Sequence, residues 1–375
     1  MATGNIEADG LRRSGPRQAN TDMSRRYLFL CPDSRGASGG IAVIYDTVVT
    51  LRKAGYDAFV VHNSPDAGYS EHLGAPPLLY TNAVSRLYRK YGGPRAKIKS
   101  VSRALRRPFG RKKLQPLTLR PQDSIIAPEF MMPEAMEAFP DHPLGVFVQN
   151  PFSFMQAHLR GMGRGFDIRA RVHWFIGISE ICEKAMDLIQ VGRRFYMPVS
   201  MKPDEFPYRE LKEAVITYMP RKRPWEAAII AEALQRRGRV SDYQIRPLEG
   251  LPRNMISEQL QKSRFFISLL KDEALGFPAA EAMAAGCVTI GFTGLGTNEY
   301  FDTSTGIPVP EGDIFGLVEA VEAAVAEYEV DPTRLDAMRR YASERIHARY
   351  GRARFEEALL KIWAELDATP QASVP

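Results

Sequence analysis

Two glutamates eight positions apart frame the stretch of sequence with the most chemical content. Glu273 and Glu281 enclose the string Ala-Leu-Gly-Phe-Pro-Ala-Ala, in which Gly276 and Pro278 are typical of the start of a helix. A helix start offers free backbone N–H groups and a positive dipole end, and both attract phosphate. Gly276, Phe277 and Pro278 are therefore placed to receive a diphosphate. Ionised carboxylates on either side can accept hydrogen bonds from hydroxyl groups, which indicates a nucleotide-sugar site.

The elements around this stretch place it at the edge of a parallel sheet. Residues 264–270 form an apolar run typical of a buried strand, a helix is expected over 278–285, and residues 287–292 form the next buried run. In open α/β sheets, ligands bind beyond the carboxyl ends of the strands, where we expect the loop with Glu273 to lie. The alternative interpretation is an ordinary strand–helix–strand unit whose glutamates only meet solvent.

Three consecutive cations stand at a second strand end. Arg221, Lys222 and Arg223 lie between an expected strand at 214–218 and an expected helix at 225–236. Cations in this place can neutralise a diphosphate and the charge that develops on it as it leaves. We expect Arg221 and Lys222 to act in catalysis with Glu273, and Arg223 to help bind the donor, although spacing does not decide which cation holds the diphosphate. A solvated basic turn is the alternative.

A glycine pair marks a further loop near the start of the chain. Gly39 and Gly40 lie between an apolar run at 27–31 and an expected helix at 41–54. Without a side chain, both residues allow a ligand to approach the backbone closely, so we expect them to contact the donor. Tight packing of the loop on its strand is the alternative interpretation.

The whole string from Glu273 to Glu281 resembles the Glu-x7-Glu motif of the family 4 glycosyltransferases, which are retaining enzymes of the GT-B fold. The glycine loop, the cations after the strand at 214–218 and the later run with Glu299 also resemble that family. The resemblance implies an α/β protein with two Rossmann-like domains facing across a cleft and a C-terminal helix that crosses back to the first domain. It also implies transfer of a sugar, with retention, from a nucleotide-diphosphate sugar to a glycan or lipid-linked acceptor.

One position departs from the family pattern. Where much of the family has a histidine after a strand of the first domain, this chain has Gln149 and Asn150. Amides hydrogen-bond sugar hydroxyls but cannot titrate at neutral pH. We expect both amides to bind the donor, Glu281 to bind its ribose and Glu273 to bind hydroxyls of its sugar.

The length and composition of the chain predict its domain organisation and its compartment. The 375 residues predict two domains. We expect disordered tails at 1–24 and 369–375, domains at 25–203 and 204–350, and the returning helix at 351–368. Cys31, Cys182 and Cys287 are isolated in apolar surroundings, which predicts buried thiols in a reducing cytoplasm. The first residues do not resemble a signal peptide, and no apolar run approaches the ~18 residues of a membrane span.

The formal charge of +6 is concentrated in one segment. Residues 73–122 contain no Asp or Glu and thirteen Arg and Lys, interrupted by glycine and proline. We expect this basic insertion to bring the protein to an anionic membrane surface or acceptor, which would make it peripheral on the inner face of a membrane. A solvated loop is the alternative.

Two other functions stay open at this point. A GT-B nucleotide-sugar epimerase would use acid and base groups in the same pocket, and a non-catalytic protein could bind an anionic polymer or nucleic acid through the basic insertion. No RNA- or DNA-binding motif is present in the sequence, so we expect no nucleic acid. No Asp-x-Asp occurs either, so we expect neither a metal nor another cofactor.

Overall fold

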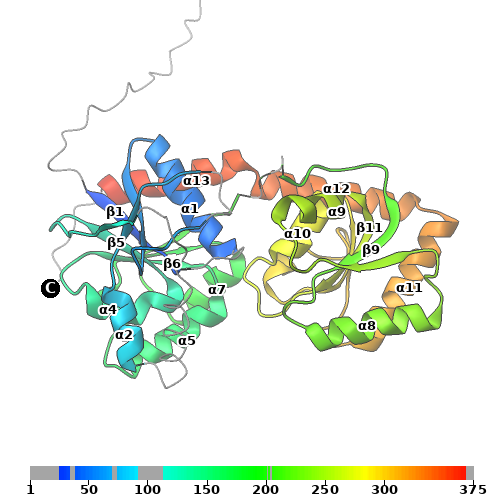
Figure 1. Ribbon diagram of the computed structural model, residues 1–375, viewed down its shortest axis with the longest axis horizontal. Coiled ribbons are helices and arrows are strands. Elements are labelled where there is room, and N and C mark those ends of the chain that lie inside the picture. The colour runs from blue at the N-terminus through cyan, green and yellow to red at the C-terminus, as the bar shows by residue number, and fades with distance from the viewer. Residues whose placement is uncertain are drawn as a thin grey trace, which may run out of the picture.

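The computed structural model describes residues 25–33, 39–69, 74–91, 113–200, 202 and 205–368. The expected tails at 1–24 and 369–375 and residues 92–112 of the basic insertion lie outside the described residues. The described part forms two α/β domains side by side (Figure 1), each built on its own parallel sheet. The expected fold class, with two Rossmann-like domains, is confirmed.

The first domain contains a sheet whose described strands follow the order β4-β3-β2-β1-β5-β6-β7-β8, with every neighbouring pair parallel. The central strands are buried apolar runs, as expected for a sheet covered on both faces. The strands are β1 (Arg26–Leu30), β2 (Asp57–His62), β3 (Leu78–Tyr80), β4 (Gln115–Pro116), β5 (Ser124–Pro128), β6 (Leu144–Val148), β7 (Trp174–Gly177) and β8 (Arg194–Tyr196).

Helices join these strands and cover both faces of the sheet (Figure 1). Sequence signals fix their starts: Asn150 caps one helix by accepting a hydrogen bond from the Ser153 N–H, and Pro151 follows at its first position. The helices are α1 (Gly39–Lys53), α2 (Ala83–Tyr91), the 3-10 turn η1 (Glu129–Met131), α4 (Met132–Ala138), α5 (Pro151–Met162), α6 (Ile168–Arg171) and α7 (Glu180–Leu188).

The second domain, within residues 205–368, has a parallel sheet in the order β10-β9-β11-β12-β13. Its strands are β9 (Glu213–Tyr218), β10 (Gln244–Pro247), β11 (Ser263–Leu269), β12 (Val288–Phe292) and β13 (Ile307–Pro308). Its helices are α8 (Pro224–Arg237), α9 (Arg253–Lys262), α10 (Phe277–Ala284), the 3-10 turn η3 (Gly296–Glu299), α11 (Ile314–Val330) and α12 (Thr333–Tyr350).

The last helix, α13 (Arg352–Ala368), lies across the first domain (Figure 1). The Trp363 ring stacks on Phe29 of β1 at 5.7 Å between ring centroids and meets Tyr27 edge to face at 5.8 Å. The Arg352 guanidinium donates to the Thr50 hydroxyl of α1 at 2.6 Å. A fully buried tryptophan on this helix ties the C-terminal end of the chain to the first strand.

Strands β3, β4 and β8 were not expected from the sequence. They are two or three residues long and partly or fully exposed, so they carry no apolar run that could be recognised. Each lies at or near an edge of the first sheet.

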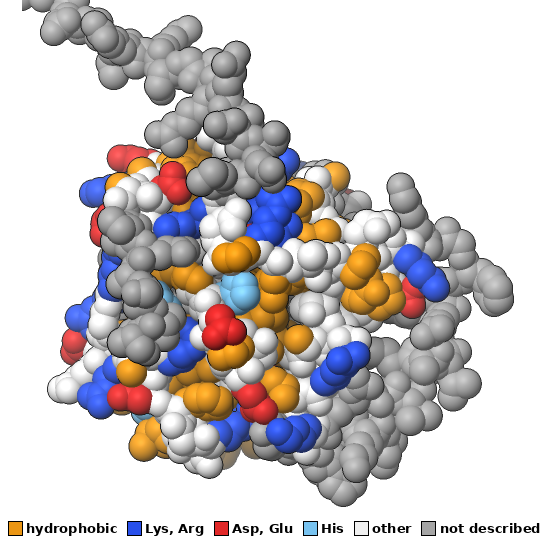
Figure 2. Space-filling model, turned by 90° about the vertical axis from the view of Figure 1, so that its left-hand side faces the viewer, with side chains coloured by type: hydrophobic (Ala, Val, Ile, Leu, Met, Phe, Trp, Pro, Cys, Tyr) orange, Lys and Arg blue, Asp and Glu red, His pale blue; other side chains and the backbone are white. Residues whose placement is uncertain are grey.

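On the face of the first domain turned away from the second, basic, acidic and apolar side chains are interspersed (Figure 2). No helix in the described part of the chain is long and apolar enough to cross a membrane.

Candidate functional site

The loop after β11 is held in a tight conformation that only glycine allows at one point. Gly276 has a φ of +69°, and a Cβ there would lie 2.3 Å from the Thr297 methyl. The buried Tyr300 hydroxyl donates to the carbonyls of Leu275 and Gly276 at 2.7 and 2.9 Å. The start of α10 is therefore fixed in place from both sides.

The starts of two helices from different domains meet at this point. Among the described residues, no side chain caps the start of α10, and its first turn contains no acidic residue. Across the domain boundary, a Cβ on Gly39 would lie 3.3 Å from two ring carbons of Phe277. Helix starts with free N–H groups attract phosphate, and here one helix start from each domain lies at the same place. The structure thus brings Gly39 next to the Phe277 ring, with Pro278 following in the first turn of α10.

Lys222 and Glu273 form an ion pair beside these helix starts. The Lys222 ammonium lies 2.7 Å from a Glu273 carboxylate oxygen and donates to the Lys271 carbonyl at 2.7 Å. The two side chains are 31% and 19% exposed, so a ligand can reach both. The loop also contains Asp272 with a φ of +51°, a conformation that is uncommon for a residue with a side chain. A cation and an acceptor at this point suit a diphosphate and a sugar hydroxyl, respectively.

The two neighbouring arginines differ in burial and do not belong to this ion pair. Arg221 is exposed. Arg223 is buried at the start of α8, where its guanidinium pairs with the carboxylates of Glu226 and Glu311 and lies 4.8 Å from the Phe292 ring centre. Within the described chain, the three expected cations therefore have different environments. Arg221 is exposed, Lys222 pairs with Glu273, and Arg223 is buried and packed.

Glu281 faces away from solvent, one turn into α10. Its side chain is 6% exposed, and the Arg253 guanidinium donates to it at 2.8 Å. Burial raises the pKa of the Glu281 carboxyl, while the charge of Arg253 acts in the opposite direction. The carboxylate that we expect to bind ribose is thus already bound on one side by an arginine.

The first domain contributes neutral groups to the same region. The Asn150 amide donates to the Asp272 carbonyl of the second domain at 3.1 Å. A Cβ on Gly40 would lie 2.8 Å from Gln149 Oε1, and in the described structure this buried oxygen has no hydrogen-bond partner. The structure therefore places Asn150 against the Glu273 loop and Gln149 against Gly40 at the start of α1.

A buried carboxylate in this region was missed at the level of sequence. Glu129 follows β5 directly, is 3% exposed and accepts a hydrogen bond from the Gln149 backbone N–H at 3.0 Å. Burial raises the pKa of its carboxyl to about 7, while backbone hydrogen bonds act in the opposite direction. The available signal was a lone carboxylate directly after a buried apolar strand, at the ligand-facing edge of the sheet.

A second missed feature joins the domains. A Glu299 carboxylate oxygen accepts the backbone N–H of Glu180, at the start of α7, at 2.7 Å. The Tyr350 hydroxyl donates to the other oxygen, and the Arg349 guanidinium lies 3.7 Å away. Glu299 of the second domain therefore caps a helix of the first. Nothing in the spacing of the sequence indicates this pairing.

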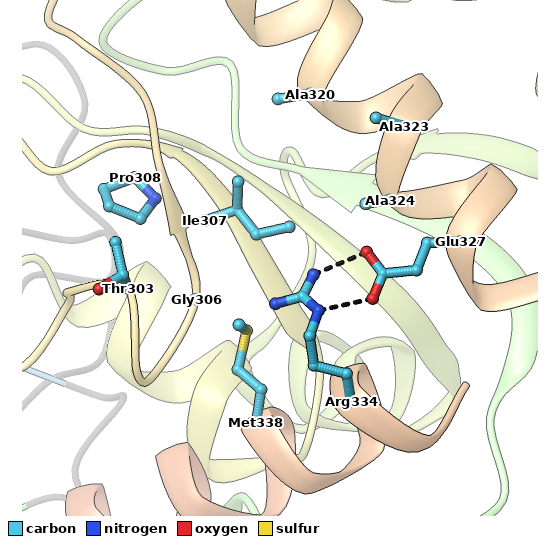
Figure 3. Close-up of a pocket in the computed structure, with 10 residues that line it drawn as sticks. All are labelled: Thr303, Gly306, Ile307, Pro308, Ala320, Ala323, Ala324, Glu327, Arg334 and Met338. Carbon is cyan, nitrogen blue, oxygen red and sulfur yellow. Dashed lines mark hydrogen bonds and ion pairs between the residues drawn. The ribbon is translucent and has the colours of Figure 1, made fainter. Parts of the chain in front are cut away.

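A hollow of about 320 Å³ lies elsewhere, between β13, α11 and α12 (Figure 3). Its charged groups neutralise each other, because Arg334 forms two hydrogen bonds with Glu327 at 2.6 and 2.7 Å. None of its lining residues belongs to the expected site, and we do not assign it to the ligand.

Among the residues that the structure describes, no three His, Cys, Asp or Glu side chains form a metal-binding group.

Comparisons with known proteins agree with this geometry. No family model matches the chain. The alpha-1,6-glucosyltransferase of Actinobacillus pleuropneumoniae serotype 7 (strain AP76) is 25% identical over 324 residues, which cover 82% of this chain and 85% of that protein.

Similar folds occur among solved structures. Sucrose-phosphate synthase from Thermosynechococcus elongatus matches with a TM-score of 0.63 at 13% identity, covering 92% of this chain and 100% of that one. Anabaena HepE in complex with UDP and glucose matches with a TM-score of 0.61 at 12% identity, covering 91% and 99%. The chain thus has the GT-B fold of two Rossmann-like domains, and it is a homologue of a glucosyltransferase.

Proposed function

We propose that this protein moves a hexose from a nucleotide-diphosphate sugar to a glycan or lipid-linked acceptor, with retention at the anomeric carbon. The chain is a glycosyltransferase of the hexosyltransferase class, in line with its sequence relative and its GT-B fold. Retention, the assignment to family 4 and the residue roles below are the part that we propose.

The observation that carries this proposal is the Lys222–Glu273 ion pair beside two helix starts. Glu273 lies on the loop that leads into α10, Gly39 of α1 approaches the Phe277 ring at the start of that helix, and the ion pair is partly open to solvent. A diphosphate bound at the helix starts would carry a charge of about −2 or more. Because this charge is larger than that of a carboxylate, Lys222 can turn from Glu273 to the phosphate oxygens. Glu273 would then be free to accept hydrogen bonds from the sugar.

We propose a mechanism without a covalent intermediate. Glu273 lies on the loop that leads into α10, where we expect the phosphate to bind, so its carboxylate would lie on the leaving-group side of the sugar and could not attack from behind. We propose that the acceptor hydroxyl attacks on this same face and that its proton passes to the departing diphosphate. Lys222 and the exposed Arg221, with the α10 start, would stabilise the charge on the leaving group, a role that needs no metal.

Specificity for the donor would come from both domains. We propose that Glu281 accepts hydrogen bonds from the ribose and that Gln149 and Asn150 bind sugar hydroxyls. The unpartnered Gln149 oxygen, noted among the described residues, would gain a donor in this way. For Arg223, which is buried and already paired with Glu226, we propose a role in the packing of α8 in place of the expected contact with the donor.

The acceptor and its surroundings follow from the charge of the chain. We propose a role in the synthesis of a cell-surface polysaccharide or glycolipid in the cytoplasm, with the basic insertion at 73–122 docking on an anionic membrane. The thirteen cations of this segment support this docking. Binding to anionic vesicles that falls steeply with salt would agree with it, and binding that is indifferent to lipid charge would not.

The function is tested with the purified chain and a panel of UDP-, ADP-, GDP- and dTDP-hexoses. At 100 times its dissociation constant, the true donor should stabilise the protein by about 2.7 kcal/mol in a thermal shift measurement. We expect this donor to be hydrolysed or transferred equally well in EDTA, with proton NMR showing the released sugar first in the anomeric form of the donor. An epimerised nucleotide sugar, or activity lost in EDTA and restored by manganese, would contradict the proposal.

A further inference from the structure

A chain of alternating charges runs from the first domain to the buried carboxylate of α10. It begins on α1, passes through Lys202 and Glu205, which we call the interdomain linker because they lie where one domain passes into the other, and ends one turn into α10. Neighbouring members lie within ion-pair distance of each other. In order, its members are Asp46, Lys202, Glu205, Arg253 and Glu281.

Arg253 is the member that contacts both the linker and α10. Its Nη1 donates to Glu281 at 2.8 Å, and its Nε donates to the Glu205 carboxylate. The guanidinium also lies 4.8 Å from the ring centre of Phe206, which is buried. Two carboxylates and an aromatic face therefore hold this side chain in one orientation.

Glu281 needs such a partner to act on a ligand. A buried carboxylate without a cation is strongly disfavoured in its ionised form, and the carboxyl would take up a proton. A neutral carboxyl loses the strong acceptor character that suits a pair of ribose hydroxyls. In the described structure, Arg253 is the one cation within hydrogen-bonding distance of this carboxylate.

We propose that Arg253 is a positioning residue, which fixes the Glu281 carboxylate for the donor ribose and is itself anchored to the interdomain linker through Glu205. This inference rests on the proposed function, because it assigns a partner to the residue that we expect to bind ribose. Arg253 acts through Glu281 and does not touch the nucleotide. Sequence spacing gives no sign of it, since 27 residues lie between the two.

Other titratable groups also surround Glu281, and one of them, Glu205, loses a partner together with Glu281 when Arg253 is replaced. Glu205 faces it from the linker, and Tyr300 from the segment after η3. Further along α10, His347 of α12 lies at the Ala284 carbonyl, and Lys212 donates to the Ala285 carbonyl. A change in the pH dependence of binding on replacing Arg253 is therefore assigned to Glu281 only if it disappears in the Glu281→Gln background.

The experiment measures nucleotide affinity by titration calorimetry at pH 6.5 and pH 8.5. The probes are UDP, ADP, GDP and dTDP, and the proteins are the parent, Arg253→Met, Arg253→Lys, Glu281→Gln and the double variant Arg253→Met/Glu281→Gln. Arg334→Met serves as the matched control, because it also removes an arginine from an ion pair of the second domain, but at the remote hollow (Figure 3).

We expect Arg253→Met to weaken the best-binding probe by about tenfold or more at pH 6.5, the scale of a hydrogen bond to a charged group. The loss should be smaller at pH 8.5 than at pH 6.5, because a higher pH favours the ionised form of the Glu281 carboxyl. Arg253→Lys, which keeps the charge, should recover most of the affinity, and Arg334→Met should bind like the parent. In the Glu281→Gln background, Arg253→Met should cause no further loss, because its effect passes through Glu281.

Additive losses in the double variant, or a loss in Arg253→Met that does not depend on pH, would show a merely structural role and overturn the inference. Unchanged affinity in Arg253→Met would overturn it as well. If Arg253→Met does not fold, affinity in Arg253→Lys as low as in Glu281→Gln would have the same meaning. A parent protein that binds none of the four probes would overturn the proposed function and this inference with it.

Discussion

The two sides of the domain boundary carry different chemistry. The second domain presents charged groups on a strained loop, with the Lys222–Glu273 pair beside Asp272 and the α10 start. The first domain presents a glycine-led helix start and the amides of Gln149 and Asn150, backed by a buried carboxylate. The difference indicates a division of labour: the second domain handles the charge of the donor, and the first supplies neutral contacts to sugar hydroxyls.

The largest effect is expected from a substitution in the charged loop of the second domain. Glu273→Gln should lower turnover by about 10²-fold or more, because a neutral amide is a weaker acceptor for sugar hydroxyls whose bonds strengthen in the transition state. Stability should change little, since the ion pair is partly exposed. Steady-state kinetics with the identified donor checks this. Mass spectrometry that trapped a sugar on Glu273 would contradict the role of hydroxyl acceptor and identify a nucleophile instead.

Two neighbouring cations of the second domain, Lys222 and Arg223, should differ in their effect on the free energy of unfolding. Arg223→Met should lower the free energy of unfolding by about 3 kcal/mol, because the buried guanidinium pairs with Glu226 and Glu311. Lys222→Met should change it by less than about 1 kcal/mol, since this pair is partly exposed. Urea denaturation of both variants measures the difference. If Arg223→Met kept full stability and lost donor binding, Arg223 would belong to the site after all.

The buried carboxylate of the first domain gives a pH-dependent signature. The Glu129 carboxyl has a pKa of about 7 in the folded protein, above the 4.5 of an exposed glutamate. Its stabilising contribution is full below about pH 4.5 and is lost as pH rises to about 7, because the unfolded chain ionises first. Relative to Glu129→Gln, the parent should lose on the order of 1 to 3 kcal/mol of stability over this range. Parallel stability curves for the two proteins would refute the assignment.

The smallest effect is expected from the neutral amides of the first domain. Asn150 caps α5 and also reaches Asp272 across the boundary, so two substitutions can separate these roles. Asn150→Ala and Asn150→Ser should both raise the donor KM by about fivefold, the scale of one neutral hydrogen bond. Only Asn150→Ala should lose about 1 kcal/mol of stability, because serine is also a good cap. A donor KM unchanged in both variants would remove Asn150 from the site.

Much of the fold and part of the site could be predicted because local sequence determines them. Long apolar runs marked the central strands, and Gly276 with Pro278 marked the start of α10. The edge strand β4 and its neighbour β3 were missed because they are only two and three residues long and not fully buried. The adjacent Lys222 and Arg223 could not be told apart, because their different environments depend on partners as distant in sequence as Glu273 and Glu311. Arg253 was missed for the same reason, since long-range ion pairs leave no local pattern.

The central claim is that Lys222 serves the leaving diphosphate at the meeting point of the two helix starts. It is tested most directly by the rate at which nucleoside diphosphate is released from the identified donor, measured for the parent, Lys222→Met and the remote control Arg334→Met. We predict release at equal rates by the parent and the control, and release at least about 10²-fold slower by a Lys222→Met protein of unchanged melting temperature. Equal rates in all three proteins would contradict the account.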